Sequence, residues 1–93
     1  MNHYIIVKFL EDYDYISKIE EIKELFNESL ALAGVEKIEI FKSNSKLANR
    51  YDLMIKMYLT TEGLKAFDNS WIHAKWKEEY GKYIQSKTIF DCD

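Results

Sequence analysis

The alternation of apolar and polar residues in the middle of the chain predicts a strand with two partly apolar faces. One face of residues 51–59 consists of Tyr51, Leu53, Ile55, Met57 and Leu59. On the other face, Met54 and Tyr58 add apolar side chains. A strand that is apolar on both faces needs a cover on each side. A chain of 93 residues can supply helices for one side only, so we expect a second copy of the chain on the other.

Similar patterns predict three more strands and a first helix. Alternating residues predict strands over 3–10, 36–42 and 87–90. Between the first two strands, apolar residues recur every three or four positions and predict a helix over 16–33. Its apolar stripe consists of Ile16, Ile19, Ile22, Phe26, Leu30 and Ala33. Ser17 and Glu20 have the spacing of a capping box, and Gly34 stands where a left-handed C-terminal cap is expected.

A second helical region follows the central strand, and the sequence predicts that it is split in two. Thr60 or Thr61 can cap a short helix, Asn69 and Ser70 interrupt it, and Ser70 can cap the next helix. The resulting order, β-α-β-β-α-β, is the ferredoxin-like order. We therefore expect one α+β domain over 1–93, with a four-stranded antiparallel sheet and both helical regions on one face.

Composition excludes several partners. Hydrophobic residues make up 47% of the chain and aromatic residues 15%, a surplus that favours self-association or a ligand pocket. A net charge of −3 argues against binding nucleic acid. No apolar run approaches the ~20 residues that cross a bilayer, so we expect no membrane partner. Cys92 is the single cysteine, so one chain forms no disulfide. The first residues lack the pattern of a signal peptide, and we expect a cytoplasmic protein.

Two histidines are the candidate catalytic residues. His3 shares a strand face with Ile5 and Val7, and His73 shares a helical stripe with Trp76 and Tyr80. Both faces should point into the space between sheet and helices. An imidazole ionises near neutral pH and can act as a general base. The alternative interpretation is that each histidine is a hydrogen-bonded core residue.

The same interior is the candidate binding site for a small apolar or aromatic molecule. Its predicted lining is Ile5, Val7, Phe67, Trp76 and Tyr80. The competing interpretation is plain core and dimer packing, because aromatic residues dominate both. Two histidines without a cysteine or a clear third ligand fall short of the three or four ligands of a typical metal site. We therefore expect neither a metal nor a cofactor.

Three stretches, residues 3–9, 51–53 and 67–76, resemble the stress-responsive A/B barrel (Dabb) family, and the resemblance covers nearly the whole chain. It implies that two chains pack sheet to sheet into a dimeric α/β barrel. Some plant relatives are cyclases of linear polyketides that use a histidine pair and a tyrosine. The match places His3 and His73 on those histidines. Phe67 stands at the position of the tyrosine and lacks its hydroxyl.

Three functions remain open from the sequence. The first is a homodimer that binds a small apolar or aromatic molecule. The second is an enzyme, either a cyclase-like lyase or a cofactor-free monooxygenase, with His3 or His73 as the base. The third is a structural, stress-associated dimer without chemistry.

Overall fold

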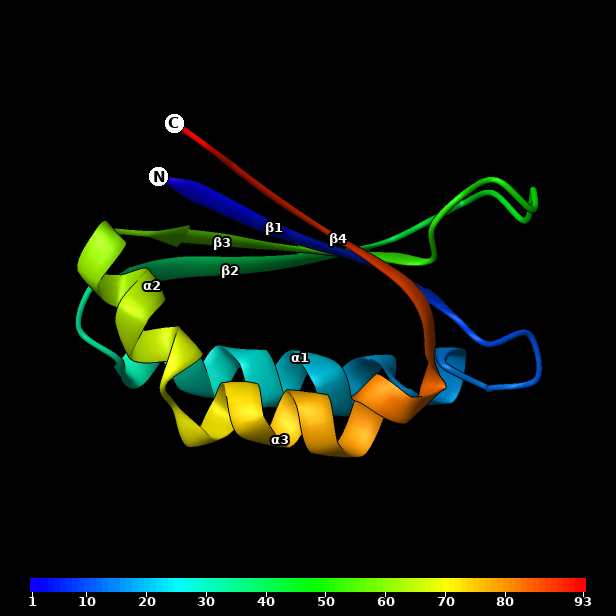
Figure 1. Ribbon diagram of the computed structural model, residues 1–93, viewed down its shortest axis with the longest axis horizontal. Helices are drawn as coiled ribbons and strands as arrows, with labels where there is room; N and C mark the ends of the chain where they lie inside the picture. Colours follow the sequence, from blue (N-terminus) through cyan, green and yellow to red (C-terminus); the bar gives the residue numbers. More distant parts are fainter.

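The computed structural model describes all 93 residues as two layers, a sheet and the helices that cover one of its faces (Figure 1). The strands are β1 (Asn2–Phe9), β2 (Val35–Lys42), β3 (Leu53–Leu59) and β4 (Ile84–Cys92). The helices are α1 (Ile19–Asn27), α2 (Thr61–Asp68) and α3 (Trp71–Tyr80). Short 3-10 turns flank them, namely η1 (Ile16–Lys18), η2 (Glu28–Ala31) and η3 (Gly81–Tyr83).

The four strands form one antiparallel sheet in the order β2-β3-β1-β4. In the register, Ile5 of β1 lies between Ile55 of β3 and Ile89 of β4. The two ends of the chain lie side by side, because β1 and β4 pair from Asn2 and Cys92 onward (Figure 1). This arrangement confirms the predicted ferredoxin-like α+β fold.

The core lies between the sheet and the helices. Along β1 and β3 every second side chain is buried against the helices, as the alternation predicts. The buried hydrophobic residues are Ile5, Val7, Phe9, Ile22, Leu25, Phe26, Val35, Leu53, Ile55, Met57, Leu59, Phe67, Ile72, Trp76 and Tyr80. No helix has the length and apolar character that crossing a bilayer requires.

The first helix is shorter than predicted, and its buried stripe differs. The α-helical part ends at Asn27 and tightens into η2, which turns Ser29 into the core. Leu30 and Ile16 were predicted to be in the stripe but are 46% and 54% exposed. The predicted capping box is also wrong. The Ser17 hydroxyl donates to the Asp14 carbonyl at 3.0 Å, and no side chain caps α1.

Two predictions at the strand ends are also corrected. Tyr51 precedes β3 and is exposed, and its hydroxyl shares a 2.8 Å hydrogen bond with that of Thr88. It therefore does not belong to the buried face of the central strand. The last strand runs over residues 84–92 rather than 87–90, because it pairs along the whole length of β1.

The split of the second helical region is confirmed. The Thr60 hydroxyl accepts from the Gly63 amide at 3.0 Å and caps α2. The Ser70 hydroxyl accepts from the His73 amide at 3.3 Å and caps α3. Gly34 has a φ of 90°, the left-handed conformation predicted for it. This conformation brings the backbone of Gly34 against that of Gly63.

Candidate functional site

His3 lies near the start of β1 on the face of the sheet that the helices cover. It is 6% exposed, and its Nδ1 atom lies 2.5 Å from Oδ1 of Asp91 on the adjacent β4. An ionised carboxylate can only accept hydrogen bonds, so Nδ1 of the neutral imidazole must carry the proton. In the neutral form of His3, Asp91 therefore sets the tautomer and leaves the lone pair on Nε2.

The second nitrogen of His3 is not fully sealed from solvent. No side-chain nitrogen or oxygen sealed from solvent lacks a hydrogen-bond partner. The contact with Asp91 is the one hydrogen bond of the His3 side chain, and it uses Nδ1. Nε2 therefore keeps some contact with solvent. A small molecule that reaches this nitrogen meets a hydrogen-bond acceptor that can also take up a proton.

One apolar side chain beside this pair, Ile89, is partly uncovered. Ile89 stands two residues from Asp91 on the same face of β4 and is 47% exposed. Its neighbour on β1, Ile5, is buried. The helices therefore cover β1 and leave the helix-facing side of the edge strand β4 open to solvent next to His3.

His73 occupies a different place from the one predicted. It lies at the start of α3, half-buried, with Nδ1 3.2 Å from the carbonyl oxygen of Asp68 and its ring 5.2 Å from that of Phe67. Ile72, rather than His73, takes the buried position of this turn. No hydrogen bond or ring contact joins the two histidines.

The five residues predicted to line a ligand pocket are all in the core. Ile5, Val7, Phe67, Trp76 and Tyr80 are each no more than 2% exposed. The ring of Phe26 lies between two of them, 5.8 Å from that of Phe67 and 5.0 Å from that of Trp76. Of the five, only Tyr80 also lines any of four surface hollows, and it lines two of them. The interior that was expected to hold a ligand is thus occupied by packed side chains.

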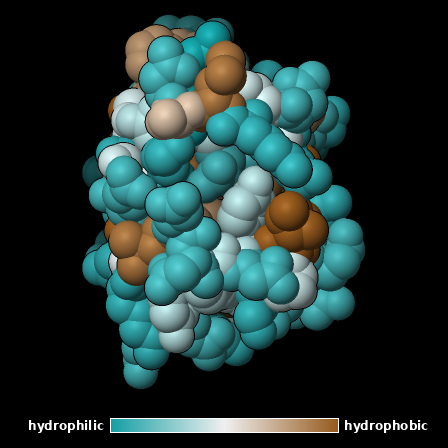
Figure 2. All heavy atoms as spheres, turned by 90° about the vertical axis from the view of Figure 1, so that its right-hand side faces the viewer, coloured by the Kyte–Doolittle hydropathy of each residue, from teal (hydrophilic) through white to brown (hydrophobic).

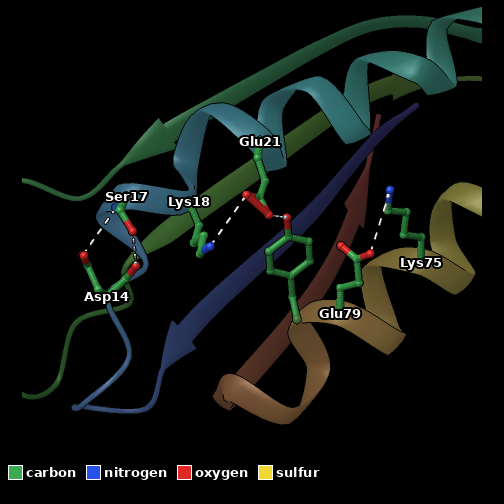
Figure 3. A network of polar contacts seen from close by, with 7 residues as sticks. Asp14, Ser17, Lys18, Glu21, Lys75 and Glu79 are labelled. Carbon is green, nitrogen blue, oxygen red and sulfur yellow. Dashed lines mark hydrogen bonds and ion pairs between the residues drawn. The ribbon is translucent and has the colours of Figure 1, made fainter.

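Figure 3 shows polar contacts around Glu21 between α1 and α3. Tyr80, which is buried, links these contacts to the core. Its hydroxyl donates to Glu21 at 2.7 Å, and Glu21 also lies 3.9 Å from the ammonium group of Lys18. Burial, followed by the hydrogen bond to Glu21, raises the pKa of Tyr80 far above its ordinary value of 10.0. Tyr80 therefore stays neutral and holds the two helices together.

Sequence reasoning missed Asp91. The last strand was predicted to end at residue 90, which left Asp91 outside the sheet. Continued alternation through Lys87, Ile89 and Asp91 would have placed the carboxylate on the same face as His3.

The comparisons with known proteins establish the fold. No protein-family model and no curated protein sequence matches the chain. A dimeric ferredoxin-like protein of unknown function from Jannaschia is similar in structure, with a TM-score of 0.78, 12% identity, and coverage of 99% of this chain and 96% of that one.

Two further solved structures share the fold. A Dabb family protein from Mesorhizobium loti has a TM-score of 0.73 and 11% identity, with 99% of this chain and 93% of that one covered. A hydroxynitrile lyase from Passiflora edulis has a TM-score of 0.72 and 8% identity, with 96% and 87% covered. A Dabb protein is therefore among the structures that have this ferredoxin-like fold, as the resemblance implied.

Proposed function

We propose that this protein is a homodimer that binds a small, largely apolar or aromatic molecule beside His3. The observation that carries the binding site is the pair formed by the buried His3 and the exposed Asp91, in which Nε2 of His3 has no protein partner. The observation that carries the dimer is the uncovered face of the sheet.

The face of the sheet away from the helices, called the open face here, has no cover in one chain (Figure 1). Its apolar and aromatic residues are Tyr4, Ile6, Phe41, Met54, Tyr58 and Phe90. Phe41 is 48% and Phe90 57% exposed. By contrast, the end of the molecule with residues 10–15 and 43–52 is mostly hydrophilic, with separate hydrophobic residues (Figure 2). The open face is thus the surface most suited to a second copy.

The dimensions of the open face support this proposal. Four strands spaced about 4.8 Å apart, each with about eight residues rising ~3.3 Å, span about 500 Å². Two such faces together bury about 1,000 Å², which reaches the lower limit for a specific interface. Solved structures with the same fold are described as dimeric, in agreement with this estimate.

Phe90→Glu tests the dimer, and Trp71→Glu is its matched control. Both side chains are aromatic and almost equally exposed, at 57% and 58%, but Trp71 lies on α3, on the helical side of the molecule. Light scattering at micromolar concentration should give twice the chain mass of 11.1 kDa for the wild type and the control. Phe90→Glu should give single, folded chains by circular dichroism. A wild-type protein that is folded but monomeric would refute the proposed dimer.

A ligand panel tests the binding site. A ligand at about a hundred times its dissociation constant stabilises the folded state by roughly 2.7 kcal/mol. We expect small aromatic compounds to raise Tm of the wild type and of His73→Ala. His3→Ala and the near-isosteric Asp91→Asn should lose this shift while remaining folded. If no compound in a broad aromatic and polyketide-like panel shifts Tm, the third function, a structural dimer without chemistry, is favoured.

The His3–Asp91 pair also favours a second function, acid–base catalysis. Asp91 orients the ring and stabilises the imidazolium that forms when Nε2 takes a proton, the role that a carboxylate has in hydrolase triads. A lyase or an aldol-type cyclase needs such a base. On a verified substrate, loss of His3 should lower turnover by at least about a hundredfold, and loss of His73 should have little effect.

The tautomer can be measured before any substrate is known. Long-range ¹H–¹⁵N NMR should show a proton on Nδ1 and a lone pair on Nε2 of His3. Asp91→Asn should disturb this pattern and leave that of His73 unchanged. A His3 ring protonated on Nε2 alone would contradict the proposed base.

A further inference from the structure

We propose that the dimer binds a small aromatic anion, such as an aromatic carboxylate, between its two sheets, with Lys56 as the cationic group. This inference rests on the proposed dimer, but it concerns the open face and not the His3 site.

Lys56 stands near the middle of the open face. It occupies the centre of β3, an inner strand, and lies between Glu39 of β2 and Tyr4 of β1 in the register. A second sheet packed on this face lies about 10 Å away. The ammonium group would therefore be among the most enclosed polar groups of the interface.

Lys56 is the one cation of this face that has no counter-charge or carbonyl partner. Lys37 lies 4.0 Å from the carboxylate of Glu39, and Lys8 donates to two backbone carbonyls in the loop 43–52 at 2.9 Å each. Glu39 faces Lys56 directly but is engaged by Lys37 and by the hydroxyl of Tyr58 at 2.7 Å. No ion pair includes Lys56.

Two aromatic rings hold this ammonium group in place. Lys56 Nζ lies 4.5 Å from the ring centroid of Tyr58 and 5.6 Å from that of Tyr4, within the range of cation–π attraction. The nearby side chain of Tyr58, and less strongly that of Tyr4, raises the pKa of Lys56 above its ordinary value of 10.5. Lys56 is therefore charged at neutral pH, and its position is restricted before any ligand binds.

A largely apolar hollow lies at the Met54 end of the same face. It has a volume of about 210 Å³, and its lining residues are Ile6, Phe41, Lys42, Ser43, Tyr51, Asp52, Leu53 and Met54. The Asp52 carboxylate accepts a hydrogen bond from the Phe9 amide at 2.8 Å. Met54 is two residues from Lys56, a separation of about 7 Å along a strand. The ammonium group lies over Tyr58, on the other side of Lys56 from Met54. For a carboxylate on a ring in the hollow to meet it, the Lys56 side chain must turn from Tyr58 toward Met54.

Dimerisation makes this anion more important. Packing two open faces together brings two uncompensated Lys56 charges toward each other across the interface, and like charges in such a place oppose association. An anion between the sheets offsets both charges. The chemistry of the site thus selects a ligand that is flat, apolar at one end and negatively charged at the other.

Benzoate is the probe, with benzyl alcohol and benzylamine as neutral and cationic comparators. Calorimetric titration of the wild-type dimer should show binding of benzoate only, with NMR shifts at Ile6 and Met54. Lys56→Met should raise the dissociation constant of benzoate by at least about tenfold, as expected for loss of a charged hydrogen bond. Lys56→Arg should retain binding. Lys77→Met is the matched control, because Lys77 lies on the exposed side of α3 and its loss changes the net charge by the same amount. This variant should bind benzoate as tightly as the wild type.

Light scattering of the same samples separates this inference from the dimer. A wild-type dimer that does not bind benzoate, or a Lys56→Met dimer that binds as tightly as the wild type, overturns the Lys56 site and leaves the dimer intact. A folded wild-type monomer at these concentrations overturns both. If inorganic sulfate binds as tightly as benzoate, Lys56 attracts any anion without selecting an aromatic one, and the inference is also overturned.

Discussion

The contact between Gly34 and Gly63 gives the sharpest stability prediction. A Cβ atom on Gly63 would lie 2.5 Å from the carbonyl carbon of Gly34 and closer still to its oxygen. These are backbone atoms, so no side-chain rotation relieves the overlap. The Gly34 carbonyl is also fixed, because it accepts a 2.8 Å hydrogen bond from the Thr60 amide.

The magnitude of the Gly63→Ala effect follows from what must move. Separating the two segments weakens the Thr60–Gly34 hydrogen bond, worth about 1 kcal/mol, and disturbs the Thr60 cap of α2, worth about 1 kcal/mol. Overpacking adds about 1–3 kcal/mol. We therefore expect a loss of about 3 kcal/mol or more, and a Tm lowered by roughly 12–24 °C in a domain of this size.

Gly81→Ala is the matched control. Gly81 has φ −55° and ψ −39°, and a Cβ atom there meets nothing within 4 Å. Alanine should stabilise by about 0.5–1 kcal/mol by restricting the unfolded chain, raising Tm by roughly 2–8 °C. Calorimetry at one fixed protein concentration measures both, because dimerisation makes Tm concentration-dependent. If Gly63→Ala melts at the wild-type temperature, the close backbone contact is not required for the fold.

Three further predictions concern the helical layer. Tyr80→Phe should reduce the loss of stability at alkaline pH. Because the pKa of Tyr80 is raised in the folded state, the hydroxyl contributes stability below pH ~10, and this contribution is lost as the pH rises further. Equal slopes of the unfolding free energy against pH between pH 9 and 12 in the two proteins would refute this role. Ser70→Ala should cost about 1 kcal/mol in urea unfolding by removing the α3 cap, whereas Ser17→Ala, whose hydroxyl caps no helix, should cost clearly less. Trp76→Ala should lower the free energy of unfolding by about 3–5 kcal/mol, whereas Trp71→Ala should lower it by about 0.5 kcal/mol or less. Equal losses in the two variants would contradict the burial of Trp76 and the exposure of Trp71.

The fold could be predicted because its signals are local and periodic. Alternation in β1 and β3, the caps Thr60 and Ser70, and the left-handed Gly34 each follow from a few neighbouring residues. The errors arose where tertiary contacts decide. Ser29 is buried in place of Leu30 because the helix tightens into a 3-10 turn at its end, and no local sequence pattern indicates that change.

The candidate site could be predicted only in part, for the same reason. The alternation of β1 places His3 on the helix-facing side of the sheet, and the structure agrees. Its partner Asp91 is 88 residues away, and only the pairing of β4 with β1 brings the two together. The expected convergence of His73 failed because a rotation of one residue along α3 decides between Ile72 and His73 as the buried side chain.

The two proposed sites lie on opposite faces of the same strands, which makes them separable. His3 and Tyr4 are consecutive on β1, so their side chains point to opposite sides of the sheet. A dimer formed through the open face encloses Lys56 and leaves the His3 nitrogen accessible from the helical side. One small molecule cannot span both sites, because the sheet lies between them. Benzoate bound at Lys56 should therefore leave the Nε2 resonance of His3 unchanged, and a large shift at His3 would show that the ligand occupies the histidine site instead.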